Sequence, residues 1–373
     1  MKSKNSHEAK LSEAFKEGFK QENFFQSVKR EFKELQDFYL DEDRKARLVD
    51  MNMAKRSFWT FVWLLKLMFL KLNPLRRLIL LIGLLLSISS TFTGAEGSSG
   101  SFGINSHILG PLILLFVLML ELKDKLLARD ELEAGRRVQI ALMPDRMPQV
   151  QGWDIWLYTR PANDVGGDLV DFYCIDEETC GVALGDVSGK GLEAALFMAK
   201  LQATIRAFLT EFSTLSKLAE KINSIFHRDS LPNKFASIIF TEFQKNSNSV
   251  KLLNAGHMPP LIIRGKNIEE LDSHAPAFGL MSEASFETRE VLINEQDFLI
   301  LYSDGVTETM NEDGVFFGDD RLREILLKHH DANAQNMGES IIREIAQFKK
   351  EAPFFDDISL AVLQRKQHHG HGD

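Results

Sequence analysis

Four aspartates of the sequence stand beside glycine or at the end of a strand-like run. They lie in the motifs Val165-Gly166-Gly167-Asp168, Gly185-Asp186-Val187-Ser188-Gly189-Lys190-Gly191, Tyr302-Ser303-Asp304-Gly305 and Phe355-Asp356-Asp357-Ile358. Carboxylates gathered in a fold repel one another and cannot be buried ionised without a counter-charge. The set therefore predicts a site for divalent cations, and hard oxygen ligands favour magnesium or manganese. Two such ions could generate hydroxide and clamp a phosphoryl group.

The segment Gly185–Gly191 also has the glycines and the lysine of a nucleotide-hydrolase phosphate loop. It departs from that loop because one residue is missing between the glycines and Gly191 replaces the hydroxyl residue that would hold magnesium. A strand that ends at Asp186, followed by a tight glycine turn, instead puts this carboxylate and the Val187 carbonyl at a sheet edge. Taken alone, the segment is as compatible with a plain turn as with a metal site.

Five motifs, taken together and in this order, resemble the metal-dependent protein phosphatase family of type 2C, and within it the bacterial stage II sporulation protein E type. They are Gly166-Gly167-Asp168 with Asp171-Phe172, Gly185 to Gly191, Asn254-Ala255-Gly256-His257-Met258-Pro259-Pro260, Tyr302-Ser303-Asp304-Gly305-Val306-Thr307-Glu308 and Asp356-Asp357-Ile358-Ser359. The resemblance covers roughly residues 130–365. It implies an α+β fold, a four-layer α-β-β-α sandwich with two antiparallel sheets, and two manganese or magnesium ions at one end.

The resemblance also implies a role for each acidic residue. Asp186 would bridge both ions, and the Val187 carbonyl would ligate one of them. Asp168 would hold one ion, and Asp304 and Asp356 would hold the other. These four aspartates are the expected catalytic residues, and the implied reaction is hydrolysis of phosphoserine or phosphothreonine by in-line attack of water, with no covalent enzyme intermediate.

Other positions of the motifs carry less definite roles. Asp357 stands where the family usually has a residue that supports a metal ligand, and it is included in the predicted metal-binding set. Eukaryotic members use an arginine to grip phosphate and a histidine after the bridging aspartate as a candidate acid. Here Ser188 occupies the second of these positions, and the first has no clear equivalent. Arg160 is interpreted as a solvated or structural arginine, and His257 as a turn residue that braces the sheet.

The composition of the chain argues against one class of partner and bears on the redox state of the cysteines. The net charge of -9 over 373 residues argues against nucleic acid as a partner, because no basic face dominates. The length allows two or three domains. Cys174 and Cys180 flank an acidic turn and could bridge a hairpin, but a reduced pair is expected if this part of the chain is cytoplasmic.

Two apolar segments predict a membrane hairpin. Leu78–Ala95 carries no charge, and Ile104–Leu120 carries only His107 among titratable groups, so each can just cross a bilayer. Lysine and arginine precede the first segment and follow the second, whereas the loop between them has neither. This asymmetry puts both termini and the catalytic region in the cytoplasm, with the protein in the inner membrane. Two buried core helices of a soluble protein are the alternative.

The chain is expected to divide into a cytoplasmic helical N-terminal region, an interfacial helix with the membrane hairpin, a linker helix, the phosphatase domain and a disordered tail. The two spans are expected at about 78–95 and 104–120. The linker helix has apolar residues at a spacing that could pair it with a second copy in a homodimer. The boundaries of the five parts are 1–57, 58–120, 121–148, 149–365 and 366–373.

Short strands and segregated helices are expected after about Gln151. Strands are predicted at Leu169–Ile175, Gly181–Leu184, Phe235–Phe243, Val250–Asn254, Leu261–Arg264, Phe286–Ile293, Phe298–Tyr302 and Ile358–Gln364. Helices are predicted at about Leu192–Phe212, Leu215–Phe226, Asp320–Lys328 and Gln335–Lys349.

These features predict a membrane-anchored serine/threonine protein phosphatase of a bacterium. By analogy with the family, its substrate would be a phosphorylated regulator of the anti-sigma-factor antagonist kind. A catalytically silent signalling or scaffold module of the same fold is the alternative, which the intact aspartate set disfavours. A receptor that senses a ligand through the loop between the spans is a third hypothesis, disfavoured because that loop is too small for a pocket.

Overall fold

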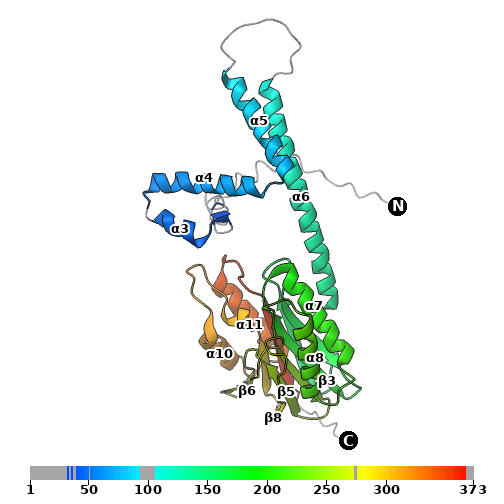
Figure 1. Ribbon diagram of the computed structural model, residues 1–373. Helices are drawn as coiled ribbons and strands as arrows, with labels where there is room; N and C mark the ends of the chain where they lie inside the picture. Colours follow the sequence, from blue (N-terminus) through cyan, green and yellow to red (C-terminus); the bar gives the residue numbers. More distant parts are fainter. Residues whose placement is uncertain are drawn as a thin grey trace, which may run out of the picture. The chain divides into compact units, whose positions relative to one another are not determined.

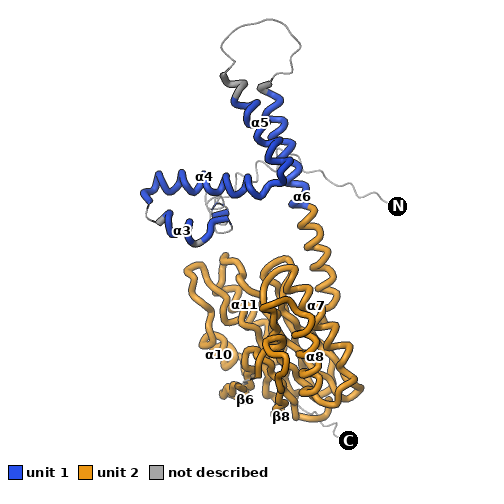
Figure 2. Tube along the Cα trace, in the orientation of Figure 1, with its two compact units in different colours: residues 1–126 blue, residues 127–373 orange. Residues whose placement is uncertain are grey.

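The computed structural model describes most of the chain, and the described part forms two compact units, residues 1–126 and 127–373 (Figure 2). The described residues are 32, 35–36, 39–49, 51–92, 106–272 and 275–366. Most of the expected N-terminal region, the loop between the expected spans and the expected disordered tail beyond Lys366 lie outside the described residues.

The first unit is helical. It contains α3 (Glu42–Val49), α4 (Met53–Lys71), α5 (Pro74–Phe92) and the first part of α6 (Ser106–Leu142) (Figure 1). The helices α5 and α6 lie against each other, because Arg76 donates hydrogen bonds of 2.6 Å to both Glu121 and Asp124. A Cβ atom at Gly110 would collide with Ser87 of α5, so glycine permits this close approach.

The helices do not support the two predicted membrane spans. Among the helices that the structure describes, none combines the length and the hydrophobicity that a bilayer crossing requires. The second expected span and the expected linker helix are also not separate elements, because α6 runs without a break from Ser106 to Leu142 and includes Pro111. The helix ends just before Pro144, as predicted from the two prolines of that segment.

The second unit contains two five-stranded antiparallel sheets. The first has the strand order β1-β10-β9-β6-β7, with bounds Trp153–Arg160, Ile358–Arg365, Phe298–Tyr302, Leu261–Arg264 and Asn267–Glu270. The second has the order β2-β3-β4-β5-β8, with bounds Asp168–Cys174, Thr179–Val187, Ala236–Gln244, Ser249–Ala255 and Arg289–Leu292. The prediction of two antiparallel sheets is confirmed.

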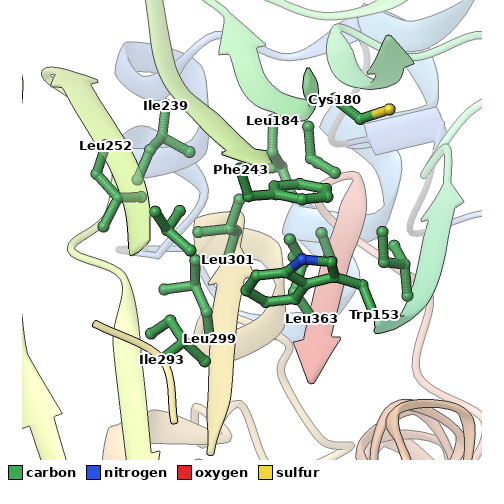
Figure 3. Packing of buried hydrophobic residues seen from close by; sticks show 14 of the residues in the cluster. Trp153, Cys180, Leu184, Ile239, Phe243, Leu252, Ile293, Leu299, Leu301 and Leu363 are labelled. Carbon is green, nitrogen blue, oxygen red and sulfur yellow. The ribbon is translucent and has the colours of Figure 1, made fainter. Parts of the chain in front are cut away.

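Helices cover the outer face of each sheet. Their bounds are Gly191–Phe208 (α7), Leu215–Asp229 (α8), Asp304–Thr307 (α9), Gly318–Lys328 (α10) and Ala334–Lys349 (α11). One buried cluster joins α7 and α8 to the second sheet, and another joins α10 and α11 to the first. Between the sheets lies a third cluster, in which Trp153 and Leu363 face Leu184 and Phe243 (Figure 3). The order is therefore helix, sheet, sheet, helix.

The two cysteines lie opposite each other in the β2–β3 pair. Cys174 and Cys180 are register partners with a Cα–Cα distance of 3.9 Å, and a disulfide joins them. The prediction of a reduced pair is therefore wrong for this structure. The other possibility, that the two cysteines bridge a hairpin across the acidic turn, is the one observed.

Candidate active site

The antiparallel topology brings the four motif aspartates to one end of the sandwich. In the second sheet, β2 begins at Asp168 and β3 ends at Val187, and the register pairs Asp168 directly with Asp186. In the first sheet, Asp304 follows the end of β9, and Asp356 lies two residues before the start of β10. Because β9 and β10 are antiparallel neighbours, these two residues also share one sheet edge.

Asp357 joins the two sheets at this edge. Its Oδ2 accepts hydrogen bonds from the backbone N–H of Gly167 at 2.6 Å and of Asp168 at 3.3 Å, and its Oδ1 accepts one from Ala162 at 2.7 Å. A Cβ atom at Gly166 would collide with this carboxylate, which explains the glycine there. Both oxygens of Asp357 thus bind backbone, so this residue of the predicted metal set supports the loop that carries Asp168.

The turn at Asp304 is fastened to β10. Ser303 Oγ accepts a hydrogen bond from Ser359 N at 2.9 Å and donates one to the Asp357 carbonyl at 3.2 Å. A Cβ atom at Gly305 would overlap the same carbonyl, so only glycine fits between the turn and the strand. The carboxylate of Asp304 is therefore held beside the segment that carries Asp356.

The loop after Asp186 is a sharp turn that leads into α7. Gly189 and Gly191 have φ angles of +106° and +72°, which side chains rarely tolerate. Ser188 Oγ accepts a hydrogen bond from Phe235 N at 3.0 Å, which ties the loop to the start of β4. The Val187 N–H donates to the Gly167 carbonyl at 3.4 Å, so the predicted carbonyl ligand lies next to the loop before Asp168.

Electrostatics show that the carboxylates act on one another. Asp168 is 5% exposed, and burial together with repulsion from Asp186 and Asp357 raises its pKa well above the ordinary value. Burial and the nearby carboxylates of Asp304 and Asp356 raise the pKa of Asp186 to about 7. Burial and Asp356 also raise the pKa of Asp304. Asp168, Asp186, Asp304 and Asp356 thus form one carboxylate centre, whose negative charge the protein itself does not fully compensate.

The atom types of the four aspartates suit a divalent cation, although their side chains are not arranged around one point. Within the described part of the chain, no three histidine, cysteine or acidic side chains are arranged to hold one ion. The donors are nevertheless all hard carboxylate oxygens, and buried Asp168 Oδ2 has no hydrogen-bond partner. Asp356 is 2.8 Å from the ammonium group of Lys190. The Lys190 ammonium group therefore forms an ion pair with the Asp356 carboxylate, which is one of the predicted metal ligands.

Three side chains that support the carboxylate group were not predicted from the sequence. Gln139 of α6 is 5% exposed, donates to the Gly166 carbonyl at 2.8 Å and accepts from Gly166 N at 3.2 Å. Arg206 of α7 donates two hydrogen bonds, of 2.6 and 2.9 Å, to the fully buried Asp171 of β2. Lys190 is the third. Only Lys190 and Asp171 lie within a motif, and nothing in the sequence marks Gln139.

His257 lies in a turn, as predicted, and Arg160 is exposed and stacks on an aromatic ring. Asn254 closes the turn around His257: its amide donates to the carbonyls of His257 and Met258, and its oxygen accepts from His257 N at 2.7 Å. Burial lowers the pKa of His257 to about 4, so its ring is neutral, and its Nδ1 lies 2.8 Å from Ser237 Oγ. The guanidinium of Arg160 lies 4.2 Å from the ring centre of Phe354.

Comparison with known proteins identifies the second unit. The family model for stage II sporulation protein E (SpoIIE) matches residues 176–366. The chain is 28% identical to protein IcfG of Synechocystis over 275 residues, which cover 66% of this chain and 43% of IcfG. It is 25% identical to phosphoserine phosphatase RsbU of Bacillus subtilis over 240 residues, which cover 64% of this chain and 71% of RsbU.

A solved structure shows the same fold. The PP2C domain of SiaA from Pseudomonas aeruginosa superposes with a TM-score of 0.57 at 18% identity, over 65% of this chain and 98% of that domain. The family match spans just over half of the chain and includes Asp186, Asp304 and Asp356 of the carboxylate group. The chain therefore belongs to the stage II sporulation protein E (SpoIIE) family, and its second unit has the same fold as the PP2C domain of SiaA.

Proposed function

We propose that the protein is a metal-dependent serine/threonine protein phosphatase that acts on a phosphorylated regulatory protein. The convergence of Asp168, Asp186, Asp304 and Asp356 at one edge of both sheets carries this proposal. The chain spans 43% of IcfG and 71% of RsbU, so the activity is argued from its own residues. The name of RsbU, a phosphoserine phosphatase, supports the substrate class.

The aspartates would hold two magnesium or manganese ions. Asp186 would contribute to both ions, because it pairs with Asp168 in one sheet and its carboxylate is repelled by Asp304 and Asp356 of the other. Ions bound there would supply an activated water and neutralise charge on the phosphoryl oxygens. Asp357 then keeps the loop before Asp168 in place, as do the hydrogen bonds from Gln139 to Gly166.

Phosphate release by the full chain tests this function. A generic phosphate ester and a phosphoserine peptide are incubated with manganese, and again with excess chelator. We expect turnover that requires the metal and that Asp304→Asn abolishes, with the circular dichroism spectrum unchanged. No turnover of either compound or of a phosphorylated anti-sigma-factor antagonist, by a folded and metal-loaded protein, would favour the alternative of a silent scaffold module.

Membrane anchoring is a second part of the proposal. The charge-free segment Leu78–Ala95 supports it, as does the exposure of large apolar side chains on α5 and α6, including Leu85 at 67% and Leu118 at 63%. The expected location is the inner membrane, with the phosphatase domain in the cytoplasm. The chain should sediment with membranes, resist carbonate extraction and dissolve in detergent. Release by carbonate would contradict the anchor.

Dimerisation through α6 is a third part. Leu122 and Leu126 are each at least 50% exposed and lie one helical turn apart, as on a self-pairing face. Light scattering of the detergent-solubilised chain should give the mass of two copies, and Leu126→Glu should give one. A monomer at all protein concentrations would exclude this interface.

A further inference from the structure

A cavity of about 610 Å³ lies beside the carboxylate centre and has no part in the proposed reaction. Its walls come from the last turns of α6, the following segment up to Arg146, strand β1 and Val170 of β2. This volume is typical of small-molecule sites. Gln139, which binds Gly166, lines the cavity, and none of the four motif aspartates does. The cavity is therefore a neighbour of the centre and not a part of it.

Three arginines from three different segments converge on this cavity. They are Arg136 of α6, Arg146 of the connecting segment and Arg160 at the end of β1. In the described part of the chain none of these guanidinium groups forms an ion pair, whereas other arginines, such as Arg206, bind carboxylates directly. Asp145 is the one acidic residue in the lining. The cavity therefore has an excess of positive charge.

Two of the three arginine side chains, those of Arg146 and Arg160, are held in place by aromatic rings. Arg146 lies over the ring of Tyr158 at 5.7 Å, and Arg160 lies over the ring of Phe354 at 4.2 Å. Such stacking orients the planar group without using its N–H donors. Guanidinium groups presented in this way bind phosphate through paired hydrogen bonds. The remaining lining includes the apolar side chains of Ile140, Leu157 and Val170, which suit an organic part of a ligand.

We propose that this cavity binds a phosphorylated small molecule of nucleotide size. Its phosphate groups contact Arg136, Arg146 and Arg160, and its organic part packs on the aliphatic wall. The cavity volume, three converging cations and an apolar wall together fit an organic phosphate better than inorganic phosphate, which would leave most of the space unfilled. A bound ligand would connect the end of α6 to β1 next to Gln139.

Isothermal titration of the full chain tests the proposal. Excess chelator is present, so that phosphate cannot bind through metal at the carboxylate centre. The probes are AMP, ATP, GTP, pyrophosphate and inorganic phosphate. We expect at least one nucleotide to bind with one site per chain, more tightly than inorganic phosphate, with an affinity that falls as salt is added. The same nucleotide should raise the melting temperature.

Variants locate the site. Arg136→Ala, Arg146→Ala and Arg160→Ala should each weaken binding of that nucleotide by about 10-fold or more. Arg137→Ala is the matched control, because Arg137 is the next residue of α6, is 67% exposed and pairs with Glu133 at 3.5 Å. This control should bind the nucleotide as the wild type does.

Three results would overturn the proposal. One is the absence of binding of every probe at millimolar concentration by a chain whose melting curve is normal. Another is binding that the three arginine variants leave unchanged but that Asp186→Asn removes, which would place the phosphate at the carboxylate centre. The third is equal affinity for inorganic phosphate and for all nucleotides, which would exclude a site built for an organic phosphate.

Discussion

Asp168 is buried at the start of β2, and the buried Asp357, which precedes β10, extends its carboxylate to the same place. Asp304 and Asp356 are half-buried near the end of β9 and the start of β10. In the buried half, three backbone N–H groups donate to the Asp357 carboxylate, and the Gln139 side chain binds Gly166. In the open half, Asp356 contacts a side-chain cation, Lys190, which is 55% exposed. The first half is fixed by the fold, and the second is accessible to ions and substrate.

The largest effect is expected at Asp186, where the two halves meet. Asp186→Asn removes the carboxylate that lies opposite Asp168 and repels Asp304, so it should lower turnover of a phosphoserine peptide by at least about 100-fold. Initial rates at saturating manganese measure this loss. Asp331→Asn is the control, because Asp331 is an exposed carboxylate between α10 and α11. Equal loss in both variants would show that charge alone is responsible.

The next effect is expected in the buried half. Asp357→Asn replaces one acceptor oxygen by an NH2 group, so the side chain loses either the bonds from Gly167 and Asp168 or the bond from Ala162. Activity should fall by about 10- to 100-fold, as for other residues that orient metal ligands. The apparent affinity for manganese should fall in parallel. If kcat and the manganese affinity stay normal, Asp357 does not position the Asp168 loop.

A smaller loss is expected at Gln139. Gln139→Leu leaves the N–H and the carbonyl of Gly166 unpaired in a buried place, which should lower the free energy of unfolding by about 1 to 3 kcal/mol. Urea denaturation measures the change. Gln149→Leu is a suitable control, since Gln149 is exposed and bonds only to the nearby Met147 carbonyl. Similar stability of both variants would exclude a role for Gln139 in holding the loop.

The pH dependence of stability should reveal the contribution of the carboxylate centre, because Asp186 has a raised pKa. Folding raises the pKa of Asp186 from 3.8 to about 7, so between these values the folded state keeps a proton that the unfolded state has lost. In chelator, stability should therefore fall as the pH rises through this window. Asp186→Asn should flatten the curve of melting temperature against pH. An identical slope in the variant would refute the raised pKa.

The smallest effect is expected in the open half. Lys190→Met removes the ammonium group that contacts Asp356 and so removes a competitor for metal. The variant should bind manganese a few-fold more tightly, by an amount typical of one partly exposed ion pair. Titration calorimetry measures the affinity. Weaker manganese binding would mean that Lys190 assists the metal and does not compete with it.

The sequence predicted the strands whose patterns are strong. β6 and β9 have the predicted bounds, and the other predicted strands differ by a few residues at their ends. Two strands were missed for opposite reasons. β1 carries apolar residues toward both the inter-sheet core and the helices, so its alternation is masked, while the short β7 is mostly exposed and rich in glutamate.

The candidate site was only partly predictable. Its aspartates stand in local motifs, and the β2–β3 and β9–β10 pairings bring them to one end of the sandwich. The different roles of adjacent Asp356 and Asp357 were expected from the family resemblance alone, because they depend on which carboxylate points toward the Gly167 amide. The bond between Gln139 and Gly166 depends on how a helix lies on the domain, a tertiary contact that leaves no pattern in sequence.

We propose that the buried and the open half together form one divalent-metal centre that hydrolyses phosphoserine. Manganese binding and phosphoserine-peptide hydrolysis should be measured on the same full-length samples, by electron paramagnetic resonance and phosphate release, for the wild type, Asp168→Asn and Asp356→Asn. We predict two bound ions in the wild type, fewer in each variant, and turnover that follows the ion count. Unchanged manganese binding in both folded variants, or hydrolysis that persists in excess chelator, would contradict the claim.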